Sequence, residues 1–204
     1  MVARTPRAVG GKRDVCLSQP DILDHPLSYA GALERRPLQR IDGIVVHCTE
    51  LPDLAAAREC GEELRYPHSG TGNSGHFYID RSGHIEQWVP LEYTAHHCRG
   101  FNRCSIGIEL VNLGRYPHWL HTDHQQFQEA YPPPQILGLL ALLRWLSRAV
   151  PAVHWIAGHE DLDRTVVPSS NQPDACVRRK LDPGPLFPWS QVLAATGLQR
   201  RLAP

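Results

Sequence analysis

Residues 42–49 read DGIVVHCT, a short apolar and β-branched run that gives way to polar side chains. A run of this composition, bounded by turn residues, predicts a buried strand. His47 lies near the end of this strand, just before the polar pair Thr49 and Glu50. Functional sites of open α/β sheets are built at such strand ends. The stretch therefore predicts both a buried strand of the fold and a candidate functional residue.

The segments on either side of this strand alternate between strand-like and helix-like patterns. Further strands are predicted at 76–80, 84–89, 104–111 and 153–157, with a hairpin turn at 81–83. Helices are predicted over 53–65 with Asp53 as N-cap, over 135–149 after three prolines, and from about Trp189. Residues 160–178 are polar and predict a long loop. Interleaved strands and helices indicate an α/β fold with one central sheet.

Length and charge limit the possible classes of protein. A chain of 204 residues has the size of one domain and can bury a sizeable core without disulfides. Its 21 basic and 21 acidic side chains balance, which argues against nucleic acid as a partner. No apolar run approaches the roughly 18 residues that a membrane span needs. Residues 1–40 lack periodicity and are expected to form an N-terminal arm, which leaves residues 41–200 as the main domain.

The N-terminus and the cysteines bear on the cellular compartment. Residues 1–13 are basic, but no apolar stretch follows them, so we expect no secretory signal and a cytoplasmic location. None of the six cysteines forms a C-x-x-C pair, which argues against a zinc knuckle or a thioredoxin-like site. In a reducing compartment we expect free thiols. Cys98 and Cys104 flank a short loop and could pair after export.

Three candidate metal ligands lie on separate predicted elements. His47 and His159 each end a short predicted strand, and Asp182 begins the rigid turn DPGP at 182–185. Two imidazoles and a carboxylate, with one coordination position left open, form a plausible catalytic zinc set. The alternative is that each histidine is an ordinary polar residue at a strand end, because the chain has no local H-E-x-x-H motif.

Two charged residues are candidates for the chemistry itself. Glu109 lies inside the apolar run 106–111, and a carboxylate there could act as general base beside a metal. The alternative is a position on the outward face of the strand. Lys180 lies two residues before Asp182 and could stabilise a developing oxyanion. The alternative is a solvated member of the basic run 178–180.

Two further histidines are candidates for substrate binding. His76 opens a predicted strand after a glycine-rich loop, and His97 lies in the segment Ala95-His96-His97-Cys98. Either imidazole could line a cleft or donate to a substrate carbonyl. For the other histidines, packing or surface exposure is the default expectation.

Four of these segments resemble the zinc-dependent N-acetylmuramoyl-L-alanine amidase family of type 2, which is related to the peptidoglycan recognition proteins. They are IVVH at 44–47, SIGIEL at 105–110, GHED at 158–161 and KLDPGP at 180–185. The resemblance extends over roughly residues 41–190. It implies a mixed central β-sheet flanked by helices and makes residues 41–200 the amidase domain.

The family resemblance also implies a role for each matching residue. His47, His159 and Asp182 match the zinc ligands, and Glu109 matches the glutamate that acts on the activated water. Lys180 matches the lysine that supports the transition state, and His97 matches the histidine of an A-W-H-A-G-like segment. The implied reaction is hydrolysis of the amide between N-acetylmuramic acid and L-Ala, with a muropeptide or peptidoglycan as substrate.

The chain departs from the family pattern in two places. The segment AHHCRG at 95–100 has no tryptophan, and the segment between His159 and Asp182 is longer than in compact cytoplasmic members. Two alternatives therefore stay open: a non-catalytic muropeptide-binding module, and a zinc hydrolase of the same fold that acts on another amide. The oligomeric state is also open. For a cytoplasmic enzyme, we expect faster cleavage of soluble anhydro-muropeptides than of intact murein.

Overall fold

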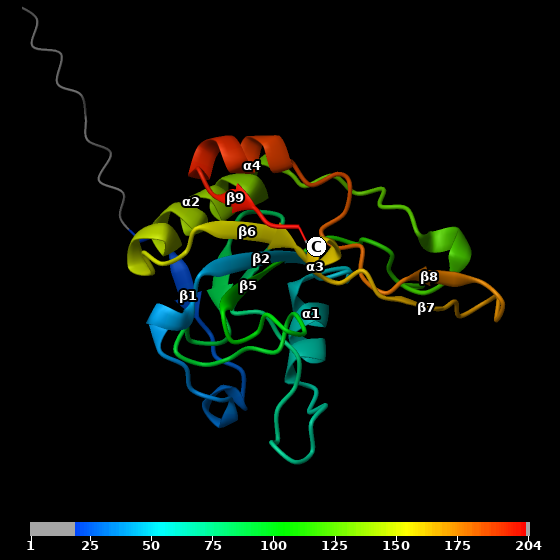
Figure 1. The fold of residues 1–204 in the computed structure, drawn as a ribbon, viewed down its shortest axis with the longest axis horizontal. Helices are drawn as coiled ribbons and strands as arrows, with labels where there is room; N and C mark the ends of the chain where they lie inside the picture. The colour runs from blue at the N-terminus through cyan, green and yellow to red at the C-terminus, as the bar shows by residue number, and fades with distance from the viewer. Residues whose placement is uncertain (1–18, 203–204) are drawn as a thin grey trace, which may run out of the picture.

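The computed structural model describes residues 19–202, and a mixed seven-stranded sheet forms their centre (Figure 1). The basic residues 1–13 lie outside the described residues. The strands are, in spatial order, β1 (Ile22–Asp24), β4 (Ile85–Gln87), β3 (Phe77–Ile79), β5 (Ser105–Leu110), β2 (Gly43–Cys48), β6 (Trp155–Gly158) and β9 (Gln199–Arg200). All neighbours pair in parallel except β3 and β4, which form the expected hairpin. The prediction of a mixed central sheet is confirmed.

Strand β2 is the buried strand predicted from the sequence. All six of its residues are buried, and it lies between β5 and β6, both parallel to it. Parallel strands covered on both faces are typically continuous apolar runs, which explains the β-branched composition of this segment. Because parallel strands share an edge at their carboxyl ends, the residues that follow β2, β5 and β6 come close together.

Figure 1 shows helices α2 (Pro133–Ala149) and α4 (Trp189–Thr196) on one face of the sheet and α1 (Leu54–Glu62) on the other. Helix α2 (Pro133–Ala149) begins two residues earlier than predicted, because Pro133 and Pro134 fit the first turn, where no backbone donor is needed. Its fully buried leucines are Leu139, Leu142, Leu143 and Leu146. Their spacing of three or four residues forms one apolar stripe, and each side chain contributes roughly 1.5–3 kcal/mol by burial. Helix α4 (Trp189–Thr196) packs beside α2.

The opposite face carries helix α1 (Leu54–Glu62) and the N-terminal segment (Figure 1). The Asp53 side chain accepts a hydrogen bond of 2.8 Å from the backbone nitrogen of Ala56, which confirms the expected N-cap. Residues 30–32 and 38–40 form short 3-10 helices, η1 (Ala30–Ala32) and η2 (Leu38–Arg40). The described part of the expected N-terminal arm packs on the domain, with β1 at the edge of the sheet.

The prediction of a long loop over residues 160–178 is wrong. The segment begins within helix α3 (His159–Leu162) and continues into a hairpin of β7 (Val166–Pro168) and β8 (Cys176–Arg178). The polar residues between the two strands form only its connection. The hairpin projects beside the 3-10 helix η3 (Thr122–His124), and Ser170 donates a backbone hydrogen bond of 2.9 Å to Leu120 (Figure 1).

Within residues 19–202, no helix combines the length and the apolar character needed to cross a bilayer.

Candidate metal centre

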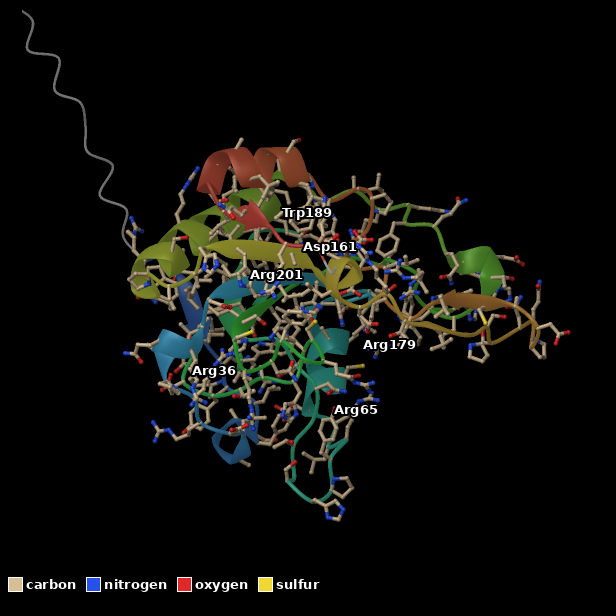
Figure 2. The ribbon with its side chains drawn as sticks, viewed as in Figure 1. Arg36, Arg65, Asp161, Arg179, Trp189 and Arg201 are labelled. Carbon is tan, nitrogen blue, oxygen red and sulfur yellow. The ribbon has the colours of Figure 1, made fainter. Side chains whose placement is uncertain are left out.

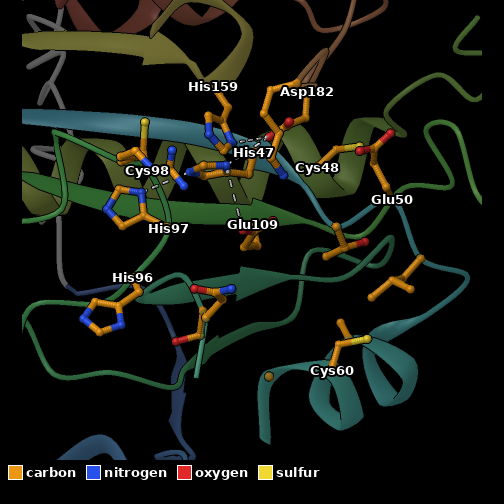
Figure 3. A pocket seen from close by; sticks show the side chains of 18 of the residues that line it. His47, Cys48, Glu50, Cys60, His96, His97, Cys98, Glu109, His159 and Asp182 are labelled. Atoms are coloured by element: carbon orange, nitrogen blue, oxygen red, sulfur yellow. Dashed lines mark hydrogen bonds and ion pairs between the residues drawn. The ribbon is translucent and has the colours of Figure 1, made fainter. Parts of the chain in front are cut away.

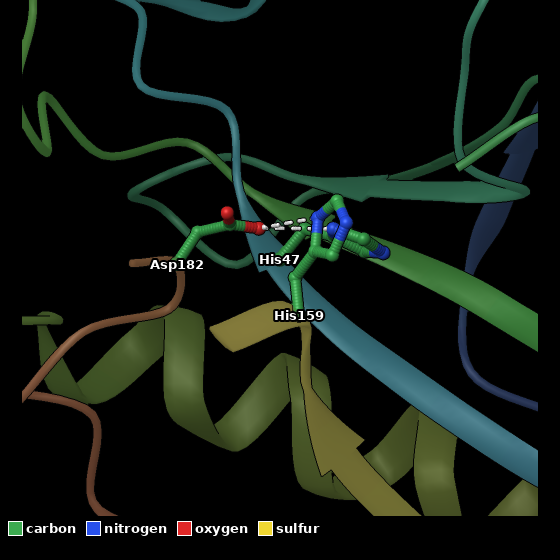
Figure 4. Close-up of side chains that lie close together, drawn as sticks. All are labelled: His47, His159 and Asp182. Carbon is green, nitrogen blue, oxygen red and sulfur yellow. Dashed lines mark hydrogen bonds and ion pairs between the residues drawn. The ribbon is translucent and has the colours of Figure 1, made fainter. Parts of the chain in front are cut away.

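The side chains of His47, His159 and Asp182 converge at the carboxyl ends of β2 and β6 (Figure 4). One ligand atom from each lies within 4.8 Å of the other two, and all three residues are buried. Asp182 Oδ2 lies 3.0 Å from His47 Nδ1 and 3.3 Å from His159 Nδ1. The structure therefore brings together the three residues that the sequence proposes as ligands.

The sheet register and one close backbone contact create this convergence. Val46 pairs with Gly158 across β2 and β6, so the residue that follows each is a histidine at the same edge. The backbone nitrogen of Glu160 donates a 2.9 Å hydrogen bond to the carbonyl of Asp182, which fixes the turn against α3. A Cβ on Gly158 would lie 2.7 Å from Pro183 Cδ, so only glycine lets the turn approach this closely.

A cap supports the start of α3, which carries His159. Asp161 Oδ2 accepts a 2.9 Å hydrogen bond from the backbone nitrogen of Gly158. The same carboxylate binds Arg200 through bonds of 3.0 and 3.1 Å. Figure 2 shows Asp161 beside Trp189 of α4, and the Arg200 guanidinium lies 4.1 Å from the centre of that indole ring. These contacts fix the helix start and hence the backbone of His159.

The protonation states of His47 and Asp182 suit a metal ion, and so does an unpaired buried oxygen of the triad. Burial lowers the pKa of His47 to about 4, although hydrogen bonding to Asp182 opposes this shift. Burial alone would raise the pKa of Asp182, but His159 and Lys180 hold it well below its usual range. Neutral imidazoles and an ionised carboxylate are the forms that bind metals. His159 Nδ1 contacts Asp182 Oδ2 at 3.3 Å without hydrogen-bond geometry, and Asp182 Oδ1 is buried without a hydrogen-bond partner among the described residues. The triad could therefore bind a metal ion.

Glu109 faces the triad from the neighbouring strand β5. It pairs with His47 in the sheet register, and its Oε1 lies 3.9 Å from His47 Nδ1. Burial and the charge of Asp182 raise the pKa of Glu109 to about 8, while Lys180 acts in the opposite direction. A carboxyl group with a raised pKa next to a possible metal site can accept and return a proton near neutral pH.

His97 and His76 occupy different environments. His97 lines the pocket, with its Nδ1 3.1 Å from His47 Nε2. His76 is fully buried and does not line the pocket; its Nδ1 accepts a 3.0 Å hydrogen bond from the backbone nitrogen of Gly107, and its Nε2 lies 3.2 Å from the Tyr93 carbonyl. His97 is therefore positioned to meet a ligand directly, whereas His76 is buried and packs against the ring of His97, with the ring centres 5.6 Å apart.

A pocket of about 670 Å³ opens beside the triad (Figure 3). Lys180 lines it, as do several residues that the sequence analysis did not single out, namely Glu50, Tyr78, Arg115 and Trp119. Tyr78 pairs with Glu109 across β3 and β5, so it extends the row of polar side chains that starts at His47. The sequence gives only a weak indication that Tyr78 lines a pocket, because it is simply a tyrosine between two apolar residues of a strand.

The cysteines that the structure describes are all free. These are Cys48, Cys60, Cys98, Cys104 and Cys176. Cys98 is buried, and its backbone nitrogen donates a 2.7 Å hydrogen bond to Asn102 Oδ1, which orders the loop that carries His97. The structure pairs none of these five residues, and their state as free thiols in the cell stays a prediction.

Comparison with known proteins gives related sequences and related folds. The chain is 34% identical over 134 residues to the 1,6-anhydro-N-acetylmuramyl-L-alanine amidase AmpD of Salmonella typhimurium, covering 61% of this chain and 58% of AmpD. It thus spans less than two thirds of the length of that relative. Among solved structures, the endolysin amidase LysCS of Clostridium intestinale superposes with a TM-score of 0.62 at 21% identity, covering 89% of this chain and 99% of LysCS.

A further solved structure has a bound ligand. It is the N-acetylmuramyl-L-alanine amidase AmiD of Escherichia coli in complex with anhydro-N-acetylmuramic acid-L-Ala-D-gamma-Glu-L-Lys. AmiD is 25% identical with a TM-score of 0.59, covering 80% of this chain and 59% of AmiD. The family model described as N-acetylmuramoyl-L-alanine amidase matches residues 37–185. Because that match spans most of the chain and contains the whole triad, the chain belongs to the N-acetylmuramoyl-L-alanine amidase family, as its four motifs predict.

Proposed function

We propose that this protein hydrolyses the amide bond between N-acetylmuramic acid and the L-Ala of peptidoglycan fragments. The family match supports the reaction class. The observation that carries the proposal is the position of Glu109, whose carboxylate faces a buried His-His-Asp triad across 3.9 Å at the wall of a pocket. Amide hydrolysis needs a group that accepts a proton from water beside a group that polarises the carbonyl, and this arrangement offers a place for both.

The cofactor in this proposal is Zn²⁺, held by His47, His159 and Asp182. Two imidazoles and one carboxylate, with a further position open to the pocket, are a donor set that catalytic zinc sites use. The buried oxygen Asp182 Oδ1, which has no hydrogen-bond partner among the described residues, supports this assignment, because an unpaired buried acceptor is costly. When bound, zinc supplies Lewis acidity that polarises the scissile carbonyl and lowers the pKa of water toward ~7.

Glu109 moves the proton in this mechanism. Its carboxylate accepts a proton from the attacking water, whose oxygen forms a bond to the amide carbon. When the carbon–nitrogen bond breaks, protonated Glu109 returns the proton to the leaving amine of L-Ala. The high proton affinity that burial gives this carboxylate supports the second half of the cycle, since the acid form must last until the amine leaves.

Lys180 and His97 stabilise the substrate in the proposed mechanism. The charge of Lys180 is felt at both Glu109 and Asp182, which supports a position close to the developing oxyanion. His97 lines the pocket and meets the substrate directly. His76 contributes to substrate binding only through His97, because it is fully buried beside Gly107 and packs against the His97 ring.

The substrate and the location follow from the same proposal. Residues 41–200 form the amidase domain, and a pocket of about 670 Å³ is in the size range of sites for compact ligands. We therefore propose soluble muropeptides as substrates, which a cytoplasmic enzyme would meet. Fractionation of the native cells tests the location.

One experiment separates this function from its alternatives. Purified protein is incubated with anhydro-muropeptides and, separately, with insoluble murein, each with and without a chelator. An amidase releases free L-Ala-terminated peptide, and the chelator abolishes this release until Zn²⁺ is restored. Binding without release would identify a non-catalytic muropeptide-binding module. Hydrolysis of other amides with intact muropeptides would identify a different zinc hydrolase.

A further inference from the structure

A buried ion pair between Glu50 and Arg115 lies at the wall of the pocket. The Arg115 Nε and Nη2 donate to the two oxygens of the Glu50 carboxylate at 2.7 and 2.9 Å, in a bidentate arrangement. Only 1% of the arginine side chain and 7% of the glutamate side chain are exposed. A bidentate pair buried to this degree fixes the relative position of the two segments that carry it.

The glutamate end of the pair belongs to the segment that carries His47. Glu50 follows His47 by three residues, and its φ of 51° lies in the left-handed region that favours glycine. Across the pair, a Cβ on Gly114 would lie 2.7 Å from Glu50 Cγ, so this glycine lets the backbone approach the carboxylate. A glutamate in a glycine-like conformation indicates that its side chain has a task there.

The arginine end reaches the segment that carries Lys180 and Asp182. Arg115 Nη1 donates to the carbonyl of Arg178 at 3.0 Å, and Nη2 donates to the carbonyl of Arg179 at 3.2 Å. These are the two residues directly before Lys180. Figure 2 shows Arg179 at the base of the β7–β8 hairpin. A single guanidinium thus connects the end of β2 with the chain that leads into the DPGP turn.

We propose that Arg115, held by Glu50, is a positioning residue that holds Lys180 at the wall of the pocket. This inference rests on the proposed function for its catalytic consequence. Arg115 does not touch the triad, and it acts through the two carbonyls that precede Lys180. The role requires arginine, because a planar guanidinium can bind a carboxylate with two donors and still reach two carbonyls, whereas an ammonium cannot.

The test is a double-mutant cycle on kcat with an anhydro-muropeptide as substrate. Arg115→Lys retains the charge and loses the bidentate geometry, and Glu50→Gln retains the shape and loses the charge. Either variant should lower kcat about tenfold, with a smaller change in KM. In a Lys180→Gln background, Arg115→Lys should lower kcat little further, because Lys180, the residue through which Arg115 acts, is already replaced.

The matched control is Arg81→Lys at a second bidentate pair. Arg81 binds both oxygens of Glu129 at 2.5 and 3.0 Å and the carbonyl of Pro52 at 2.7 Å, and neither Arg81 nor Glu129 lines the pocket. This variant should lose stability without loss of kcat. Two results would overturn the proposal. In the first, the fold losses in kcat of Arg115→Lys and Lys180→Gln multiply in the double variant. In the second, Arg115→Lys has the same kcat as Arg81→Lys.

Hydrogen exchange of the metal-free protein separates failure of this inference from failure of the proposed function. If Arg115 positions the segment, Arg115→Lys should speed amide exchange across residues 178–182 several-fold, and Arg81→Lys should leave that segment unchanged. This measurement requires neither turnover nor zinc. If the protein has no amidase activity but shows this exchange pattern, the positioning role of Arg115 stands and only its catalytic consequence is wrong. If amide exchange across residues 178–182 is unchanged in Arg115→Lys, Arg115 does not position this segment.

Discussion

His47 and Glu109 are register partners on two adjacent parallel strands, and their side chains face the same pocket with Nδ1 and Oε1 3.9 Å apart. Residues paired in this way across a sheet point to the same face. The sheet therefore places a potential metal ligand and a potential proton acceptor side by side without any contribution from a flexible loop. A site on rigid strands keeps its geometry when a ligand binds, as acid–base catalysis requires.

Replacement of the proton acceptor should abolish turnover and spare the site. Glu109→Gln retains the shape of the side chain and removes its capacity to take a proton from water. We expect kcat to fall by about 10²–10⁴-fold. The measurement is the release of peptide from an anhydro-muropeptide, with zinc content and thermal unfolding as controls. A folded, zinc-loaded variant with a near-normal rate would show that another group is the base.

The raised pKa of Glu109 predicts the pH dependence of the metal-free protein. A carboxyl group whose folded-state pKa is about 8 binds its proton more tightly in the folded than in the unfolded state. Its contribution to stability is complete below the unfolded value of about 4.3 and is lost as the pH rises through 8. Between pH 6 and 8.5, the chelated wild type should therefore lose more unfolding free energy than chelated Glu109→Gln.

The expected difference is about 1–3 kcal/mol, since each pKa unit corresponds to about 1.4 kcal/mol and the side chain is partly exposed. Urea titrations of both metal-free proteins at the two pH values measure it. Other titrating groups, such as Glu160, are present in both proteins and cancel in the comparison. Parallel stability profiles would show that the Glu109 carboxyl is not perturbed.

Substitution of the proposed ligands should remove the metal. His47→Ala and His159→Ala each leave two of the three donors, so zinc content should fall to a small fraction of one equivalent per chain. His154→Ala is the matched control, because His154 is an exposed histidine remote from the pocket. Metal analysis after dialysis measures the zinc content of each variant. A full equivalent of zinc in both ligand variants would require a different set of donors.

The convergence of the triad could be predicted from the sequence because its signals are local. His47 and His159 each follow an apolar run, and parallel strands bring such ends to one edge of the sheet. Asp182 begins a turn whose prolines and glycine are recognisable in the sequence. The hairpin β7–β8 was missed because its strands have three residues each, and its polar connection outweighs their β-branched content.

Long-range partners could not be predicted in the same way. Glu50 and Arg115 are 65 residues apart, and no local pattern indicates that they pair. The sequence also gives His76 and His97 equal standing as substrate-binding candidates. Only the packing around Gly107 separates them. The His76 imidazole is buried beside this strand against the ring of His97, and the His97 imidazole lines the pocket.

That packing leads to a prediction at Gly107. A Cβ at this position would lie 2.6 Å from His97 Cγ, so Gly107→Ala should displace the imidazole from its place beside His47. We expect kcat/KM to fall about tenfold or more, because misplacement of about 1 Å can cost that much. Gly31→Ala is the control, since no atom lies within 4 Å of a Cβ there. Equal activity of the two variants would show that the position of His97 is unimportant.

The last prediction concerns the form of the substrate. The site lies in a pocket of about 670 Å³, and the exposed Trp119 and the half-buried Lys180 line its walls. A pocket of this kind suits a compact molecule with free ends better than a cross-linked polymer. We therefore expect kcat/KM for a soluble anhydro-muropeptide to exceed the rate on intact murein, compared per cleavable amide, by at least an order of magnitude. Chelated enzyme gives the background for each substrate. A preference for murein would instead assign the protein to remodelling of the cell wall, with the hairpin β7–β8 as the first segment to test for contact with the polymer.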